Sequence, residues 1–341
     1  MLSKPSAFLV DLGLLTGDET CYFGGFGTDD FEGSLVKTCA AGRKAPLLPD
    51  AFEAMLWSKG FTNGKDDRPR VAELYREAFA QRFESAESLG YSRLCWGDEE
   101  VEQLATVLTS GAAPRLMRFY LADNRVGDEG AARLAAALGA LQELRVLGLR
   151  HNRVADEGVA RLAAALGALP ELRELRLGGN RVGDEGVVCL AAALLAPEAP
   201  QNLQLLDLYE NRVGDEGAAR LAEALGALPE LRELGLGGNR VGDEGAARLA
   251  AALRAPEALQ HLQLLDLYGN RVGDEGAERL AEALQDPKAL PGLRAVVLHH
   301  NPLGSGARAA LRAAWAEAGR PEGGAFEAPG FGTCPTGLRL S

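Results

Sequence analysis

Hydrophobic residues follow one pattern repeatedly through the middle of the chain. The pattern is L-x-x-L-x-L-x-x-N, in which the last two leucines alternate with other residues, as in a β-strand. Each asparagine opens the phrase N-R-V-x-D-E-G, and the intervals between copies are 28 or 31 residues. Such a period predicts a solenoid in which each unit stacks on its neighbours. The asparagines are Asn124, Asn152, Asn180, Asn211, Asn239 and Asn270, with a degenerate copy at Asn301.

The hydrophobic period changes to that of a helix after each asparagine. Asp128, Leu134 and Leu138 show this spacing, and the later repeats keep it. We expect the aspartate to be the N-cap of its helix, with the following glutamate at the positive end of the helix dipole. Each unit therefore reads strand, turn, helix. The predicted fold is α/β, a curved parallel sheet inside with helices outside.

The recurring asparagine and arginine have structural explanations. The asparagine amide can satisfy backbone groups of the turn that leaves the strand. The arginine that follows stacks beside its copy in the next repeat, and we expect the Asp-Glu pairs to relieve the repulsion. A solvated charge ladder is the favoured interpretation, with a phosphate site as the alternative. The arginines are Arg125, Arg153, Arg181, Arg212, Arg240 and Arg271.

The complete pattern, L-x-x-L-x-L-x-x-N-x-[VL]-x-D-E-G-A-x-x-L-A-x-A-L, resembles the ribonuclease-inhibitor-like leucine-rich repeats. These repeats also occur in Ran GTPase-activating proteins and in NOD-like receptors. The resemblance covers about residues 94–318 and implies a leucine-rich-repeat solenoid that holds other proteins on its concave face and rim. It specifies no activity. Because the chain has few cysteines, inhibition of a ribonuclease is not implied.

Three segments are predicted along the chain. Residues 1–93 form an N-terminal segment, irregular with helices, and residues 94–318 form the solenoid with about seven strands and caps. Its closing helix, 308–318, contains Trp315. Residues 319–341 are rich in glycine and proline, so we expect a tail without regular structure, either loose or pinned to a surface.

Two helices are predicted within the N-terminal segment. Pro69 can start one of them, and residues 50–58 form a shorter one. The stretch from Leu48 to Leu56 also faintly resembles the opening of an F-box, a motif of ubiquitin-ligase adaptors. A helix that starts at a proline is the favoured interpretation of this stretch.

Composition narrows the classes of function. A net charge of −12 disfavours nucleic acid and leaves neutral or basic protein surfaces as partners. No apolar run is long enough for a membrane span. Five scattered cysteines without C-x-x-C spacing argue against disulfides and zinc and favour an intracellular, cytoplasmic location, with an organelle left open. His299 and His300, if on a strand, point to opposite faces and cannot jointly chelate, so we expect no metal and no cofactor.

The concave face is the predicted binding surface, formed by positions between and just after the strand leucines. Two tyrosines flank a glycine floor in the repeat between them, about 10 Å apart by strand spacing. These tyrosines could anchor a partner. Alternatively, they are consensus residues copied when a 59-residue pair of repeats was duplicated. The predicted partner-binding residues are Leu205, Asp207, Tyr209, Glu233, Leu264, Asp266 and Tyr268.

The sequence contains no recognisable catalytic constellation, because no nucleophile, base and orienting group occur at plausible spacing. It therefore predicts a non-enzymatic scaffold or adaptor for a protein partner. Three alternatives are open: a structural subunit of a large multi-subunit complex docked by its N-terminal segment and tail, a GTPase-activating protein, and a ubiquitin-ligase adaptor.

Overall fold

The structure is a computed structural model of the 341-residue chain. It describes residues 44–59, 67–254, 259–285, 290–320, 325–328, 332–335 and 337–340. The first 43 residues of the predicted N-terminal segment therefore lie outside the described residues.

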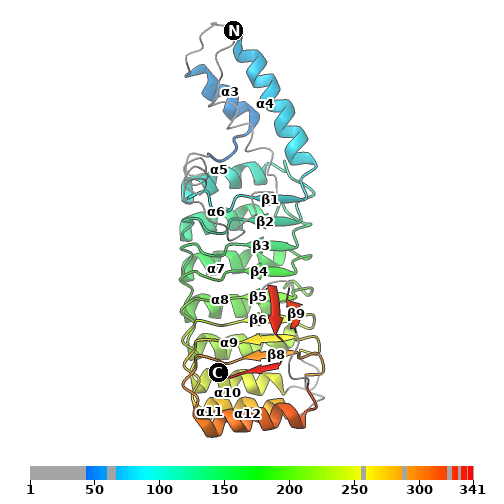
Figure 1. Ribbon diagram of the computed structural model, residues 1–341. Helices are drawn as coiled ribbons and strands as arrows, with labels where there is room; N and C mark the ends of the chain where they lie inside the picture. Colours follow the sequence, from blue (N-terminus) through cyan, green and yellow to red (C-terminus); the bar gives the residue numbers. More distant parts are fainter. Residues whose placement is uncertain are drawn as a thin grey trace, which may run out of the picture.

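One parallel sheet runs the length of the stacked coils, as Figure 1 shows. Seven of its nine strands, β2 to β8, fall within the predicted solenoid, and one further strand joins at each end. Each strand pairs with the strand of the next coil. In sheet order the strands are β1 (Ser88–Gly90), β2 (Arg118–Tyr120), β3 (Val146–Gly148), β4 (Glu174–Arg176), β5 (Leu205–Asp207), β6 (Glu233–Gly235), β7 (Leu264–Asp266), β8 (Ala295–Val297) and β11 (Gly337–Arg339).

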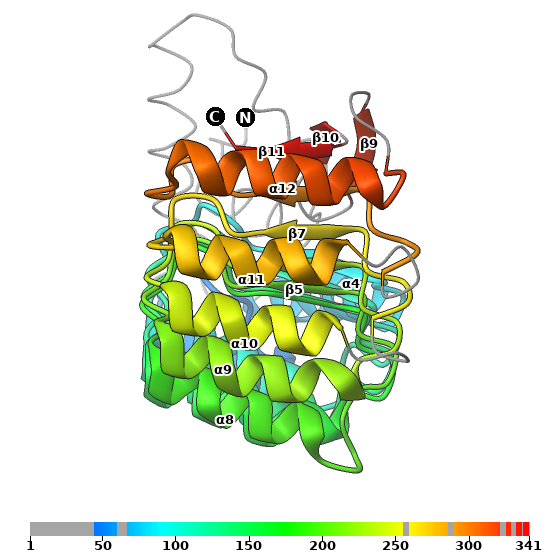
Figure 2. The same ribbon diagram turned by 90° about the horizontal axis from the view of Figure 1, so that it is seen from below.

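Helices cover one face of this sheet and leave the other to the strands (Figure 2). Each helix packs mainly on the helices of the adjoining coils, and short 3-10 turns, η4 (Leu166–Ala168) and η5 (Leu225–Ala227), extend two of them. The predicted α/β solenoid is confirmed. The helices are α5 (Asp98–Thr109), α6 (Asp128–Leu138), α7 (Asp156–Ala165), α8 (Asp184–Leu195), α9 (Asp215–Ala224), α10 (Asp243–Leu253), α11 (Asp274–Leu284) and α12 (Ser305–Glu317).

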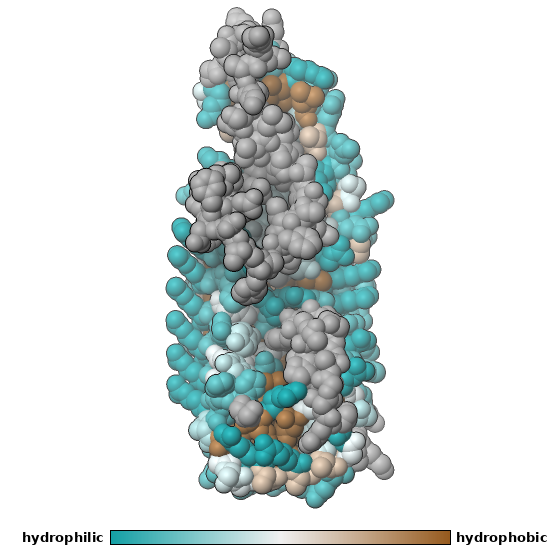
Figure 3. Space-filling model, in the orientation of Figure 1, coloured by the Kyte–Doolittle hydropathy of each residue, from teal (hydrophilic) through white to brown (hydrophobic). Residues whose placement is uncertain are grey.

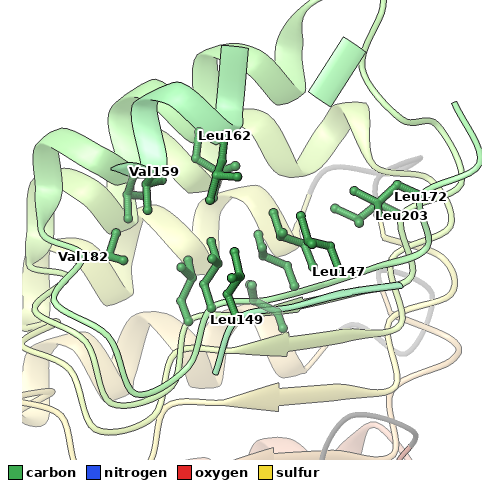
Figure 4. Close-up of a cluster of buried hydrophobic side chains, with 14 of the residues drawn as sticks. Leu147, Leu149, Val159, Leu162, Leu172, Val182 and Leu203 are labelled. Atoms are coloured by element: carbon green, nitrogen blue, oxygen red, sulfur yellow. The ribbon is translucent and has the colours of Figure 1, made fainter. Parts of the chain in front are cut away.

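The hydrophobic core lies between the sheet and the helices and continues from coil to coil (Figure 4). The middle residue of each strand, such as Leu147, points into it together with the leucine that follows the strand, such as Leu149. Val159 and Leu162 meet them from α7. All four side chains are at most 1% exposed, so each repeat completes its core only against its neighbours.

Each repeated asparagine joins two coils through its side-chain amide. In Asn239, Oδ1 accepts from the Val213 N–H at 2.9 Å, and Nδ2 donates to the Leu208 and Leu236 carbonyls at 2.8 and 2.9 Å. The other six make equivalent bonds of 2.7–3.1 Å. The seven residues are only 6–8% exposed, so the amides satisfy backbone groups that water does not reach.

The repeated aspartate caps the helix of the next coil, so its prediction as the N-cap of its own helix was wrong. Asp215 Oδ1 accepts from the N–H groups of Gly242 and Gly245 at 2.6 and 2.9 Å, and these belong to the N-cap and third residue of α10. The aspartate itself is the first helical residue, which follows a glycine or alanine N-cap. The same pair of backbone N–H groups donates to Asp98, Asp128, Asp156, Asp184 and Asp243.

The glycine of the D-E-G phrase leaves room for this carboxylate. A Cβ atom at Gly245 would lie 2.7 Å from Asp215 Oδ1, closer than real Cβ contacts. The last coil has Ala307 at this position, and there a single bond, from the Gly304 N–H, reaches Asp274. The repeat phrase therefore encodes contacts between coils as well as the local helix start.

A helical hairpin stands on the N-terminal end of the stack (Figure 1). Its helices are α3 (Pro49–Trp57) and α4 (Asp67–Glu84). Pro49 is the first residue of α3, and Phe52 turns inward to stack on Tyr75 with 3.7 Å between ring centroids. The predicted helices are therefore present, although α4 begins two residues before Pro69.

The glycine- and proline-rich tail contains strands, contrary to the prediction that it lacks regular structure. β11 extends the main sheet parallel to β8, and β9 (Ala325–Ala328) pairs antiparallel with β10 (Gly332–Pro335). Figures 1 and 2 place the β9–β10 hairpin on the strand side of the sheet, opposite the helices. The open edge of β8 supplies hydrogen-bonding partners that composition does not reveal.

Candidate functional site: the strand face

The strand face is the surface of the nine-stranded sheet that points away from the helices. The first and third residues of each strand point to it, and so does the residue two places after the strand, here called the after-strand position. Large side chains on this face lie across glycines of the next coil. A Cβ at Gly148, for example, would lie 2.9 Å from Cδ1 of Tyr120. A glycine on this face therefore lets a side chain of a neighbouring coil tilt along the stack and lie over the glycine.

Most of the predicted partner-binding residues lie on this face but are buried. Leu205, Asp207, Glu233 and Leu264 are at most 3% exposed, and Asp266 is 9% exposed. One physical reason for this burial is that neighbouring side chains tilt along the stack and cover these residues. The prediction also did not include the β9–β10 hairpin, which lies on the same side of the sheet.

The two predicted tyrosines keep partial exposure and contact each other. The rings of Tyr209 and Tyr268 stack with 6.3 Å between centroids, so the predicted gap of about 10 Å is wrong. The glycine floor explains the closure, because a Cβ at Gly237 would lie 2.9 Å from Cδ2 of Tyr209. Burial, followed by nearby Glu210, raises the pKa of Tyr209 to about 12, so its hydroxyl stays neutral near pH 7.

Two histidines extend this aromatic cluster. His299 and His300 lie 4.6 and 5.1 Å from Tyr268 between ring centroids. They were expected on opposite faces, but β8 ends at Val297 and His300 has φ +60°, which turns both rings to one side. Burial, then His300 and Arg339, lower the pKa of His299. Tyr209, Tyr268, His299 and His300 are called the aromatic cluster below.

The two predicted aspartates differ in their charge partners. Asp207 forms an ion pair with Arg150 and accepts from the Tyr209 N–H at 3.0 Å. Asp266 accepts from the Tyr268 N–H at 2.8 Å, and no ion pair with a described residue neutralises it. Burial, followed by the charge of Asp207, raises the pKa of Asp266 to about 6, against the opposing effect of that backbone bond.

The repeated arginines form an exposed row on the turns between strands and helices. Among the described residues, none of the six makes an ion pair, so the expected relief by the Asp-Glu pairs does not take that form. The aspartates bind backbone N–H groups, while Glu129 and Glu157 pair with Arg133 and Arg161 of their own helices. Evenly spaced hydrophilic side chains project from a long edge of the molecule in Figure 3, as expected for residues repeated once a coil.

The described ranges hold no group of three or more histidine, cysteine, aspartate or glutamate side chains that could bind a metal ion. Cys95 and Cys189 are exposed free thiols. No described helix combines the length and apolar character needed to cross a bilayer.

Comparison with protein families identifies the repeat. The family model described as Leucine Rich repeat matches six segments, at residues 116–135, 141–163, 169–191, 199–222, 228–250 and 258–281. The chain contains leucine-rich repeats. The ribonuclease-inhibitor-like subtype of its repeats stays a prediction.

Solved structures similar to this chain include actin-binding site 2 of leiomodin-1 and a TDR receptor. The first is 20% identical with a TM-score of 0.34, over 38% of this chain and 75% of that one. The second is 15% identical with a TM-score of 0.37, over 70% of this chain and 44% of that one. A search of curated proteins finds no match.

Reading the repeats in register could have found further residues of the site. Arg150 stands at the after-strand position, as Tyr209 and Tyr268 do, and so does His299. Aligning these positions coil by coil gives an arginine, a glycine, a tyrosine, a glycine, a second tyrosine and a histidine, so a glycine precedes each tyrosine and the histidine directly follows the second one. The β9–β10 hairpin has no comparable signal, because it lies outside the repeat pattern.

Proposed function

We propose that this leucine-rich-repeat protein is a scaffold or adaptor that binds a protein partner through its strand face and rim, without catalysis. The observation that carries the proposal is the aromatic cluster. Its members keep partial exposure beside a largely buried surface. Tyrosine rings bury a large area at low entropic cost, which makes them frequent anchors of protein interfaces.

The partner in this proposal presents a neutral or basic surface. The chain carries a net charge of −12, and the carboxylates of Glu210 and Asp266 lie beside the tyrosines. These charges repel a phosphate backbone and attract lysine and arginine. We place this binding inside the cell. No observation within the described ranges favours the complex-subunit, GTPase-activating or ubiquitin-ligase alternatives, so the scaffold is the single function proposed.

A matched pair of double variants tests the proposal. Tyr209→Ala with Tyr268→Ala removes the tyrosines, whereas Arg220→Ala with Arg279→Ala changes exposed residues on the outer helices of the same two coils. Each variant is immobilised as full-length folded protein and used for affinity purification from the native source. We expect the tyrosine variant to lose partners that the wild type and the arginine variant retain. Equal recovery by all three proteins, with unchanged circular dichroism, contradicts the proposal.

A further inference from the structure

Two coils of the solenoid carry the same strand sequence but differ in charge. Residues 205–209 and 264–268 both read L-L-D-L-Y, and both aspartates point to the strand face from the third position of a strand. Asp207 is fully buried and Asp266 is nine-tenths buried. Each accepts from the N–H of the tyrosine two residues later. Their local surroundings are therefore matched, and the difference comes from a residue two coils away.

Arg150 provides the charge that neutralises Asp207. It stands at the after-strand position two coils earlier, and its guanidinium reaches across the glycine of the coil between them, Gly178. A Cβ at that glycine would lie 2.7 Å from Asp207 Oδ2. The Arg150 side chain stays 27% exposed while its partner is 0% exposed. An arginine held at the surface can therefore reach a carboxylate at this depth.

Tyr209 occupies the corresponding position for Asp266, and it carries no positive charge. The geometry otherwise repeats, because Gly237 lies in the intervening coil and its Cβ would stand 3.0 Å from Asp266 Oδ2. Among described residues, the Tyr268 N–H is the hydrogen-bond donor to Asp266. Arg339 points to the same face two coils further on, but no ion pair joins the two residues. A buried carboxylate without a cation destabilises the folded protein. The raised pKa of Asp266 reflects this, because burial favours its neutral form.

The surroundings of Asp266 match the chemistry of a guanidinium group. A guanidinium is planar, donates in a fork to a carboxylate and stacks on aromatic faces. Asp266 supplies the carboxylate, and the rings of Tyr209 and Tyr268 stand beside it over the glycine floor. Contact with both rings adds a cation–π attraction that a neutral side chain lacks.

We propose that Asp266, with Tyr209 and Tyr268, receives an arginine side chain of the protein partner, as Asp207 receives Arg150 within the chain. This proposal rests on the proposed function and names the chemistry that the partner presents. The arginine neutralises the carboxylate, and the tyrosine rings hold the plane of the guanidinium.

The test uses N-acetyl-arginine amide as the probe and N-acetyl-citrulline amide as its uncharged analogue. The full-length protein carries 3-fluorotyrosine, and fluorine NMR follows Tyr209 and Tyr268 during titration. We expect saturable shifts of both resonances with the arginine probe and an affinity about tenfold or more weaker for the citrulline probe, the scale of a charge-assisted hydrogen bond. N-acetyl-lysine amide distinguishes a forked guanidinium from a simple cation, and equal affinity for lysine overturns the arginine assignment.

Two variants make the result specific. Asp266→Asn keeps the shape of the side chain, and we expect it to weaken binding of the arginine probe about tenfold or more. Glu223→Gln removes an exposed carboxylate on α9, away from the strand face, and we expect wild-type affinity. An unchanged affinity in Asp266→Asn overturns the proposal. If the probe fails to bind while the tyrosine double variant still loses its protein partner, the scaffold function stands and only the arginine site is wrong.

Discussion

Replacing Asp266 by asparagine should stabilise the protein, which is unusual for a change at a buried residue. Asparagine keeps the oxygen that accepts from the Tyr268 N–H and removes the buried negative charge. The folded pKa of about 6 lies about 2 above the ordinary 3.8, and this difference corresponds to about 3 kcal/mol of unfolding free energy. We expect a gain of about 1–3 kcal/mol at pH 8.

The pH dependence of this gain follows from the direction of the pKa shift. Between pH 3.8 and 6 the unfolded aspartate has lost its proton while the folded one keeps it. The folded state therefore binds more protons, and the wild type loses stability as pH rises through this window. Below the window the carboxyl is neutral in both states. The advantage of the asparagine variant should accordingly be small at pH 3.5, grow from pH 4 to 6 and level off above pH 7.

Urea unfolding followed by circular dichroism at a series of pH values measures this difference. Asp207→Asn is the matched control, because it removes the partner of Arg150 and should destabilise the protein by about 1–3 kcal/mol at pH 8. Opposite signs for two residues with the same local sequence would be the signature of their different charge partners. A gain in Asp266→Asn that does not vary with pH, or no gain at pH 8, would show that the buried charge of Asp266 does not destabilise the protein.

Three further changes test the contacts that hold the coils together, each measured by urea unfolding. Asn239→Ala leaves buried backbone groups of two coils unpaired and should lower the free energy of unfolding by about 3 kcal/mol. The exposed control Asn202→Ala should change it by less than about 0.5 kcal/mol, and equal effects would contradict the role of the Asn239 amide. Gly245→Ala forces a Cβ against the capping carboxylate and should cost about 1–3 kcal/mol, while Gly226→Ala, with open space around its Cβ, should be neutral or slightly stabilising. Trp315→Ala empties a fully buried site in the closing helix and should cost about 3–5 kcal/mol; a smaller loss would mean that α12 is not part of the continuous core.

The repeat architecture could be predicted from the sequence because its signals are local. A strand of three residues, its two leucines and the following helix all lie within one unit, so periodicity alone assigns them. The capping role of Asp215 could not be assigned in this way. Its two N–H donors belong to the next coil, about 30 residues later, and only the stacked structure brings them together.

Burial on the strand face depends on neighbours that the pattern within one repeat does not reveal. The sequence placed Tyr209 and Tyr268 on the correct face, but their contact follows from the absence of a side chain at Gly237. The different charge partners of Asp207 and Asp266 could not be predicted from their local sequences, because these are identical. Whether the aspartate is neutralised depends on whether the residue 57 positions earlier is arginine or tyrosine.

In the proposed function the strand face, and not the helices, binds the protein partner. A photo-reactive p-benzoylphenylalanine tests this directly when it replaces Tyr209 on the strand face or, in a second protein, the exposed Arg220 on α9. The proteins are irradiated in extract of the native source, and crosslinked partners are identified by mass spectrometry. We expect one abundant adduct from position 209 that is absent from position 220. Adducts from position 220 alone, or the same adducts from both positions, would contradict partner binding at the strand face.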